Sequence, residues 1–304
     1  MDENGTAAVG VSDQNAPQFR KEVLYDILFS GGNLEWYLGA QGLPLGGDLH
    51  IEDFRTRNAM WIYSRIAREL LEQEFEFWHM EPADSLLTNE AGSYGGGEVF
   101  AFQNRDFAVY LPSAASGGLL DLSSAPGAPF SVRWFDPRLG AYAGPSTLID
   151  GGGQRWLGSA PSAITEDWVV VVKRVALSAD VDELSIASPG PQKLKLDAGP
   201  DHAGDAYVLL TSASGVYPGT GVFKLLLPLN WDAFTTFTLN HPDGAYTQGF
   251  SGTLDAQGRG AAELDLSSWA SPAMIGMDLN HAFLAGPGLS PTFVSNATLL
   301  EIVP

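Results

Sequence analysis

The chain begins with two segments whose apolar residues follow the period of an α-helix. The first predicted helix starts near Pro17, a residue suited to a first helical turn, and stops at Gly31-Gly32. The second predicted helix has one apolar stripe, made of Ala59, Ile62, Ile66 and Leu70. A strand is predicted between them, over residues 34–38.

An aromatic cluster and a proline close the helical part of the chain. Phe77, Trp78 and Met80 precede Pro82, and the helical period ends with them. We interpret these side chains as packing between the second helix and the domain that follows. A domain junction is therefore expected near residue 80.

From residue 81 the pattern changes to short runs of β-branched and aromatic residues, separated by clusters of Gly, Pro, Ser and Asn. Such runs predict the strands of an antiparallel β-sandwich. The predicted strands cover residues 98–102, 107–111, 130–135 and 168–172. Alternation places Trp134 on the same face as Val132, which predicts a buried indole.

A third part repeats this pattern after a break at residues 188–191, so a domain boundary is expected between residues 174 and 190. Its predicted strands cover residues 194–196, 206–210, 235–239, 261–266, 281–284 and 297–303. The predicted fold class is mainly β. Two antiparallel β-sandwiches, over residues 81–174 and 175–304, follow a helical part over residues 1–80.

Composition narrows the classes of function. The chain has 36 acidic against 16 basic residues and a formal charge of -20, which disfavours nucleic acid as a partner. It contains no cysteine, which excludes disulfides, thiolate zinc sites and cysteine nucleophiles. The five histidines are scattered without metal-ligand spacing, so we predict no metal site and no cofactor. No uninterrupted apolar segment is long enough to span a membrane.

Each of the three parts of the chain contains a set of short sequence motifs that are distinctive when taken together. Those of the first part are Arg20–Leu24, Ser30–Gly39, Glu52–Trp61 and Phe77–Pro82. Those of the second part are Glu98–Phe100, Val109–Pro112, Val132–Arg138 and Glu166–Val170. Those of the last part are Leu196–Pro200, Leu227–Asn230, Thr253–Arg259 and Phe293–Asn296.

The first set resembles the closing section of bacterial apiosidase-like glycoside hydrolase barrels. The second is similar to a β-sandwich that often follows such barrels, named "putative collagen-binding domain of a collagenase". The third is similar to a C-terminal β module of secreted proteins from planctomycetes and other environmental bacteria. The resemblance implies that residues 1–80 are the last β/α units of a truncated (β/α)8 barrel. We expect its earlier strands, with a partner carboxylate, to lie outside this chain.

Glycoside hydrolysis needs carboxylates at the carboxyl ends of barrel strands. The resemblance implies that Glu3 is the nucleophilic or stabilising carboxylate after the seventh strand and that Glu35 follows the eighth. Asp2, Trp36 and Tyr37 would then contact a sugar, with the indole stacked on its ring. The alternative for Glu3 is an exposed acid in a frayed terminus.

Trp156 follows a run of three glycines and is the candidate for an exposed aromatic platform. Such a platform would bind a polysaccharide or a collagen-like helix, because a planar ring offers contact area at small entropic cost. Burial of Trp156 in the sandwich is the alternative.

The sequence thus predicts an accessory or binding region of a secreted, multidomain, bacterial glycoside-hydrolase-like protein, with collagen or a polysaccharide as partner. Its expected location is extracellular or periplasmic, and we do not expect the chain to be active alone. Two alternatives stay open. One is a complete or split glycoside hydrolase that uses Glu3, and the other is a pure adhesion module.

Overall fold

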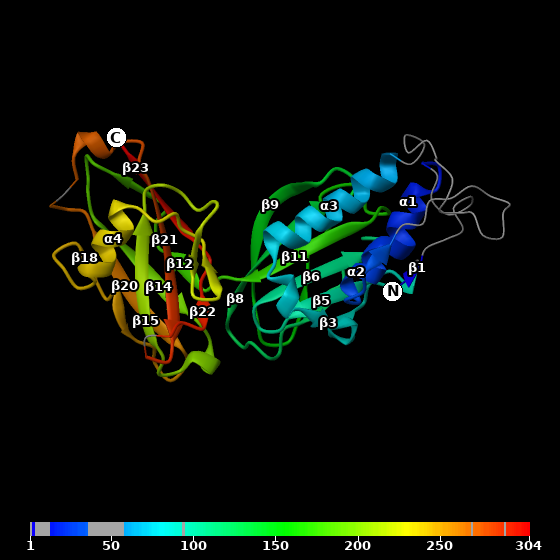
Figure 1. Ribbon diagram of the computed structural model, residues 1–304, viewed down its shortest axis with the longest axis horizontal. Coiled ribbons are helices and arrows are strands. Elements are labelled where there is room, and N and C mark those ends of the chain that lie inside the picture. Colours follow the sequence, from blue (N-terminus) through cyan, green and yellow to red (C-terminus); the bar gives the residue numbers. More distant parts are fainter. Residues whose placement is uncertain (1, 4–12, 36–57, 93–94, 269, 289) are drawn as a thin grey trace. The chain divides into compact units, whose positions relative to one another are not determined.

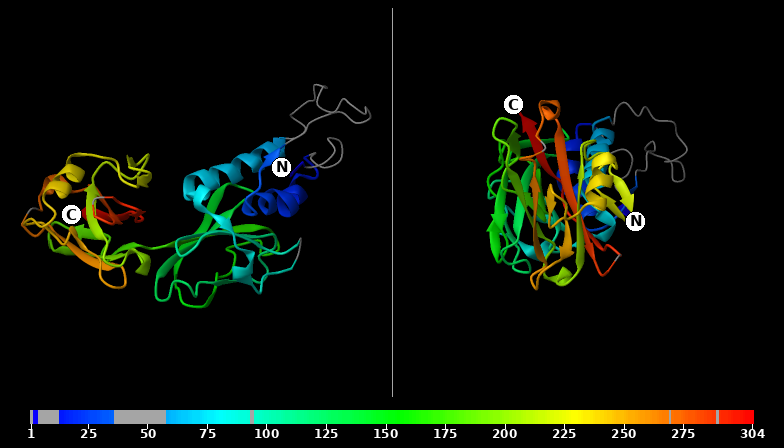
Figure 2. Two further views of the ribbon diagram at one scale, coloured as in Figure 1. Left: turned by 60° about the horizontal axis from the view of Figure 1, so that its bottom comes forward. Right: turned by 90° about the vertical axis from the view of Figure 1, so that its left-hand side faces the viewer.

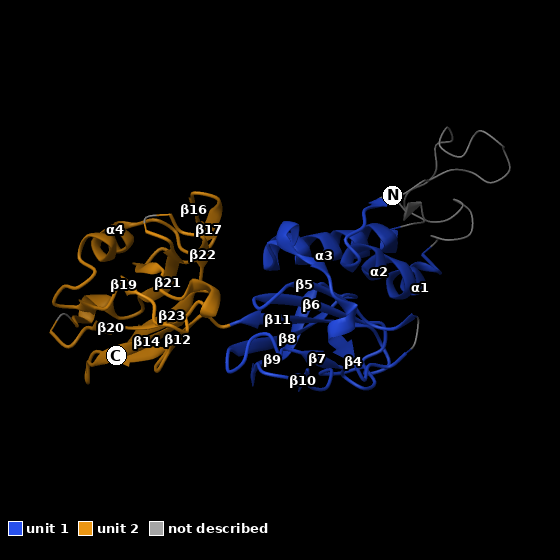
Figure 3. Cartoon of the chain, turned by 90° about the horizontal axis from the view of Figure 1, so that it is seen from below, with its two compact units in different colours: residues 1–174 blue, residues 175–304 orange. Residues whose placement is uncertain are grey.

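The computed structural model describes residues 2–3, 13–35, 58–92, 95–268, 270–288 and 290–304, and its fold is mainly β (Figure 1). The chain divides into two compact units, Met1–Arg174 and Val175–Pro304 (Figure 3). The predicted helical part and the first predicted sandwich therefore share one unit. The division of residues 1–80 from residues 81–174 as separate domains stays a prediction.

The first unit opens with a strand, a helical segment and a second strand. The strands are β1 (Asp2–Glu3) and β2 (Leu34–Glu35), and they pair in parallel. The helical segment consists of α1 (Ala16–Phe19), a π-helical turn (Arg20–Leu24) and α2 (Tyr25–Phe29). As predicted, Pro17 lies in its first turn, and it ends where Gly31 adopts a φ of 74°, a conformation that suits glycine.

Helix α3 (Asn58–Glu74) confirms the second predicted helix, but the predicted apolar stripe is only partly buried. Ile62 is 37% exposed, whereas Met60 and Ala67 are fully buried beside Ile66 and Leu70. The sheet contacts the side of the helix that carries Met60 and Ala67. Ile62 therefore comes to the outer edge of the contact.

Two sheets form the β-sandwich of the first unit. The larger has the order β3 (Glu81–Pro82), β5 (Glu98–Phe102), β6 (Asp106–Leu111), β11 (Trp168–Arg174), β8 (Pro129–Asp136) and β9 (Ala141–Asp150). The smaller has the order β10 (Gln154–Trp156), β7 (Leu119–Asp121) and β4 (Leu87–Thr88). Single 3-10 turns cover Phe77–His79 and Asp84–Leu86. The four strands predicted in this part are confirmed, and all the pairings in these two sheets are antiparallel.

The six-stranded sheet is covered on both faces. Helices α1, α2 and α3 lie on one side of it and strands β4, β7 and β10 on the other (Figures 2 and 3). Strand β6 is consequently buried at all six positions, which explains its continuous apolar run. Trp134 and Val132 both lie in the core between the two sheets, as alternation predicted.

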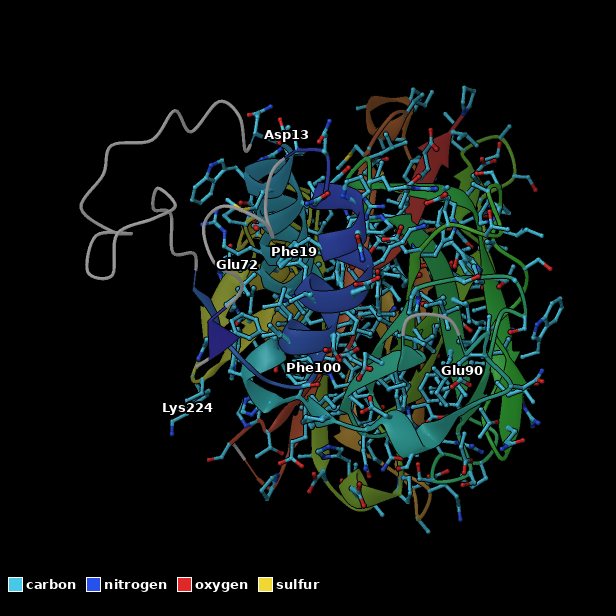
Figure 4. All side chains as sticks on the ribbon, turned by 90° about the vertical axis from the view of Figure 1, so that its right-hand side faces the viewer. Asp13, Phe19, Glu72, Glu90, Phe100 and Lys224 are labelled. Carbon is cyan, nitrogen blue, oxygen red and sulfur yellow. The ribbon has the colours of Figure 1, made fainter. Side chains whose placement is uncertain are left out.

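The apolar contact between helices and sheet includes Phe19 and Phe100, from α1 and β5 (Figure 4). Met80 belongs to the same core and is 7% exposed. Phe77 and Trp78 do not: they are 38% and 64% exposed, so their predicted packing role is wrong. The 3-10 turn that contains them directs the chain into β3 at the sheet edge, where the described residues leave these two rings partly exposed.

A buried ion pair joins the helical segment to this sheet. Arg20 donates from Nε and Nη2 to the two carboxylate oxygens of Asp167, each at 2.7 Å, and the side chains are 2% and 0% exposed. Tyr110 of β6 donates to Asp167 Oδ2 at 3.2 Å. Its ring stacks on Tyr25 with 4.6 Å between centroids. The Arg20 guanidinium also lies 4.4 Å from the ring centre of Tyr63 in α3.

The ion pair keeps Arg20 charged despite its burial. Loss of solvent acts to lower the pKa of Arg20, but the hydrogen bonds and charge of Asp167 outweigh it and raise the pKa. The bidentate geometry satisfies both carboxylate oxygens. Two charges can therefore lie inside this helix-sheet contact.

The second unit is also built from two facing sheets. One has the order β12 (Leu177–Ala179), β14 (Pro191–Asp197), β20 (Arg259–Asp265) and β18 (Thr247–Gln248). The other has the order β13 (Glu183–Ser185), β23 (Thr298–Val303), β21 (Asp278–Gly286), β15 (Ala206–Ser212) and β19 (Ser251–Thr253), with β22 (Phe293–Val294) beside β21. Short 3-10 turns cover Pro200–His202 and Pro272–Met274. The pairing of β13 with β23 is parallel and the others are antiparallel.

A hairpin, β16 (Thr220–Val222) and β17 (Leu225–Leu227), adds a third layer to this unit. Leu227 packs with Leu210 of β15 and Leu284 of β21 in a small core outside the main one. The hairpin therefore covers the outer face of the β15–β21 pair (Figure 3).

One predicted strand is a helix. Residues 235–239 lie in α4 (Ala233–Asn240), which begins after Asp232. Asp232 Oδ1 accepts a hydrogen bond from the Thr235 backbone N–H at 2.9 Å, and the Thr235 hydroxyl lies 3.3 Å from the Asp232 backbone N–H. This reciprocal capping starts the helix despite its β-branched residues, so the strand prediction was wrong because a local cap overrode propensity.

We expect Arg20→Met to destabilise the first unit by about 3–5 kcal/mol, because Asp167 would stay buried without a counter-charge. Arg65→Met is the matched control, since Arg65 pairs with Glu69 at 2.9 Å on an exposed helix face. That change should cost less than about 1 kcal/mol. Urea unfolding followed by circular dichroism measures both. Equal losses for the two variants would contradict a special role of the buried pair.

Candidate functional site

Two short parallel strands contain the two predicted catalytic residues. Glu3 ends β1, Glu35 ends β2, and the two residues stand opposite each other in the register. The helical segment over residues 16–29 connects the strands, which makes a β-α-β unit. The two glutamates therefore occupy the carboxyl ends of neighbouring parallel strands.

The other residues predicted at this position are described only in part. Asp2 pairs with Leu34 through the strand register, and Trp36 and Tyr37 lie outside the described residues. The catalytic and sugar-binding roles of these residues stay predictions.

The outer face of the three-stranded sheet carries an exposed aromatic side chain. Trp156 of β10 is 55% exposed, whereas Trp134 and Trp168 lie in the core. In the register Trp156 lies beside Leu119 of β7, and Leu119 lies beside Thr88 of β4. These three side chains form one row across the sheet, which we call the Trp156 face.

A second row supplies polar groups to the Trp156 face. Gln154 lies opposite Asp121, two positions from the first row. The Gln154 amide donates to the Thr88 hydroxyl at 3.2 Å, which fixes the amide across the sheet. Hydrogen bonds from Ser123 lower the pKa of Asp121, so its carboxylate stays charged at neutral pH. The face thus combines an indole with an amide, a hydroxyl and a carboxylate.

The position of the indole is set by the backbone around it. A side chain at Gly117 would place its Cβ 2.9 Å from Trp156 Nε1 and 2.3 Å from the Gly158 carbonyl oxygen, so this position requires glycine. Arg155 donates to the carbonyl oxygens of Asp150, Gly151 and Gly152 and so holds the preceding loop. The Trp156 indole is therefore packed against the backbone at Gly117, and hydrogen bonds hold the loop that precedes it.

The structure places Trp156 on the surface, which decides between the two alternatives for its burial. Its role in binding stays a prediction. Thr88, Asp121 and Gln154 were missed, because they come from three strands that approach one another only through pairing. Alternation in Gln154-Arg155-Trp156 was the one available signal, since it puts the amide and the indole on one face.

Three carboxyls meet where helix α2 lies beside strand β5. Glu98 forms side-chain hydrogen bonds with Asp84 and Asp26, and Asp84 Oδ1 also accepts from the Val99 backbone N–H at 2.8 Å. Burial, followed by the charges of Asp84 and Asp26, raises the pKa of Glu98 to about 8. Glu98 therefore holds a proton at neutral pH, which it shares with its neighbours. No sequence pattern predicts this cluster, because its members come from separate elements.

Neither a metal centre nor a membrane span is found in the part of the chain that the structure describes. No cluster of three or more His, Cys, Asp or Glu side chains there has the geometry of a metal site. No described helix is both long enough and apolar enough to cross a bilayer.

Comparisons with known proteins point to a binding domain in the middle of the chain. Residues 82–173 match the sequence family described as "Putative collagen-binding domain of a collagenase". This region holds the whole Trp156 face. It also holds both sheets of the first sandwich, apart from Glu81 of β3 and Arg174 of β11. No curated protein matches the chain.

Among solved structures, the chain is distantly similar to a glycoside hydrolase, with 16% identity and a TM-score of 0.38 over 53% of this chain and 37% of that one. It is also similar to a family 5 glycoside hydrolase from Bacteroides vulgatus, with 18% identity and a TM-score of 0.37 over 51% of this chain and 35% of that one. The chain thus covers little more than a third of either hydrolase. The likeness is too weak to establish a shared fold.

The stability of the first unit should fall as the pH rises from about 4.5 to about 8. In this range folded Glu98 keeps the proton that it loses when unfolded, so a higher pH favours the unfolded state. Glu98→Gln cannot ionise and should flatten this part of the pH profile. Glu81→Gln, at an exposed position on the adjoining strand, is the control. Urea midpoints at several pH values provide the measurement, and an unchanged slope in Glu98→Gln would contradict the shared proton.

Proposed function

We propose that residues 82–173 form an accessory domain that binds an extended matrix polymer, a collagen-like helix or a polysaccharide, through the Trp156 face. One observation carries this proposal: the exposed, rigidly held Trp156 lies within the region that matches a family described as collagen-binding. Collagen is the first candidate because of that description. A polysaccharide is the second, because an indole face can stack on a sugar ring.

The chemistry of the Trp156 face suits a repetitive polar polymer. The indole supplies a large contact area and loses little freedom on binding, because Gly117 and the neighbouring strands already fix it. The Gln154 amide, the Thr88 hydroxyl and the Asp121 carboxylate can bond with the N–H, O–H and C=O groups that such polymers display. A flat sheet surface allows a long chain to lie across it.

We further propose that β1 and β2 are the last two strands of a (β/α)8 barrel of the glycoside hydrolase type, with residues 1–80 as its closing units. Support comes from the parallel β-α-β unit that ends in Glu3 and Glu35. The buried pair of Arg20 and Asp167 then ties the barrel helix to the accessory sandwich. The binding domain would thereby keep the acidic strand ends attached to the polymer, although they lie in the layer opposite the Trp156 face.

This role implies a secreted protein, since matrix polymers lie outside cells. The absence of cysteine agrees with a bacterial extracellular or periplasmic setting. The second unit would be a further module of the same secreted protein.

Trp156→Ala should weaken binding to collagen fibrils or to an insoluble polysaccharide at least tenfold, equivalent to about 1.4 kcal/mol. The fold should be retained, because more than half of the side chain is exposed. Co-sedimentation of the purified chain with collagen, cellulose and xylan measures the affinity.

Trp78→Ala is the matched control, because Trp78 is 64% exposed but lies in the helical part. It should bind as the unchanged chain does. Absence of binding to all three polymers would reject the proposed function. Equal loss in both variants would reject the Trp156 face as the site.

The register of Glu3 and Glu35 favours a second candidate, a glycoside hydrolase activity within this chain. In that case Glu3→Gln and Glu35→Gln should each lower turnover of aryl glycosides at least a hundredfold, while Glu81→Gln, at an exposed position outside this site, should retain most of it. Release of the aryl group can be followed by absorbance. A chain without turnover on glucosides, xylosides, mannosides and arabinosides would leave only the accessory role.

A further inference from the structure

The second unit exposes a group of large apolar side chains around the β16–β17 hairpin. Tyr217 is 86% exposed, Phe223 is 78%, Leu226 is 57% and Trp231 is 48%. They belong to the loop before β16, the hairpin tip, the outer side of β17 and the loop before α4. We call these four residues the Tyr217 platform. Exposed apolar groups of this size commonly mark binding surfaces.

The hairpin register explains which side chains point outward. Val222 and Leu225 are paired and pack toward the small core beneath the hairpin. Gly221 and Leu226 form the next pair and lie on the opposite side. The Leu226 side chain comes within 3.3 Å of the ideal Cβ position at Gly219, so it extends toward the loop that carries Tyr217.

One asparagine holds the loop of Tyr217 in place. The Asn230 side-chain amide donates to the carbonyl oxygens of Ser214 and Tyr217 at 2.7 and 2.8 Å, and its Oδ1 accepts from the Gly219 N–H at 3.0 Å. The Asn230 backbone N–H also donates to Gly215 O at 2.9 Å. These four hydrogen bonds fix the loop. They place the backbone of Tyr217 beside Asn230, which directly precedes Trp231.

Trp231 is fixed as well. Its indole N–H donates to the Thr236 hydroxyl in the first turn of α4 at 3.1 Å. The next residue, Asp232, accepts from the Ala213 N–H at 2.7 Å and from the Ser214 hydroxyl at 2.9 Å. The Trp231 ring and the backbone that carries Tyr217 are therefore preorganised, which lowers the cost of ordering the protein on binding.

Charge and surface shape restrict the class of ligand. Lys224, labelled in Figure 4, is the only charged residue between positions 213 and 231, in a chain with a formal charge of -20. A single lysine on an acidic protein does not suit an anionic polymer or an anionic membrane. Ideal Cβ positions at Gly215 and Gly221 meet no atom within 4 Å, so bare backbone lies beside the rings and keeps their faces accessible.

We propose that the Tyr217 platform binds a neutral polysaccharide chain. The C–H faces of its sugar rings would stack on Tyr217 and Trp231, with Phe223 and Leu226 extending the contact along the hairpin. An open surface with exposed aromatic side chains suits flat sugar rings better than interlocking protein side chains. This site lies in the second unit and is independent of the Trp156 face.

The test uses the full chain with Trp156→Ala, so that binding through the first unit does not contribute. Co-sedimentation with insoluble cellulose, xylan and mannan should detect binding to at least one of them. Adding Tyr217→Ala or Phe223→Ala should raise the Kd at least tenfold. Adding Tyr217→Phe keeps an aromatic face and should leave the Kd within about threefold.

Ile275→Ala is the matched control, because Ile275 is a 43% exposed apolar residue of the same unit outside the platform. It should leave the Kd unchanged. The proposal is overturned if the Trp156→Ala chain binds none of the three polysaccharides, or if Tyr217→Ala binds as well as that chain. Tyr217-dependent sedimentation with phosphatidylcholine vesicles, in the absence of polysaccharide binding, would instead assign the platform to a lipid surface.

Discussion

The buried contact between Arg20 and Asp167 is the constraint on which the first unit depends. Two charges can be removed from water only when each satisfies the other, and here both carboxylate oxygens receive a hydrogen bond at 2.7 Å. The contact allows one position of the helical segment on the sheet, because a small shift would leave a charge unpaired. Tyr110 and Tyr63 surround the pair and connect it to the sheet and to α3.

This contact attaches the helical segment to the two-layered sandwich, which gives the unit three layers. The six-stranded sheet has helices on one face and the smaller sheet on the other, so its central strands are buried throughout. The outer side of the three-stranded sheet is left as a free face of the sandwich, and Trp156 lies there. The acidic strand ends and the proposed binding face thus belong to opposite layers of one compact unit.

In the second unit, hydrogen bonds of two polar side chains hold neighbouring segments together, as the ion pair does in the first unit. Asn230 forms hydrogen bonds with the loop before β16. Asp232 accepts hydrogen bonds from the start of the same loop and from the start of α4. These bonds hold exposed aromatic rings on irregular backbone. Exposed aromatic side chains beside a backbone held by hydrogen bonds are the feature that the two proposed binding sites share.

Local pattern was enough to determine most of the longer strands of both units, because side chains alternate between two faces with a period that sequence shows directly. It missed short strands such as β4, β7 and β10. It also determined the first helix, through Pro17 and Gly31, and the burial of Trp134. It failed at residues 235–239, where the cap by Asp232 made a helix of a β-branched run. It failed again at Phe77 and Trp78, because whether an aromatic side chain is buried depends on which layer lies over it.

Only the tertiary structure could pair Arg20 with Asp167, since 147 positions separate them and neither stands in a distinctive local pattern. Only the tertiary structure could likewise bring Glu98 into contact with Asp26 and Asp84, or place Trp156 in one row with Thr88. The sequence by itself determined the two N-terminal helical segments and most of the longer strands, because backbone preference and side-chain period are local. The partners of charged and polar groups were decided by packing, because the free energy of such a group depends on the neighbours that folding brings to it.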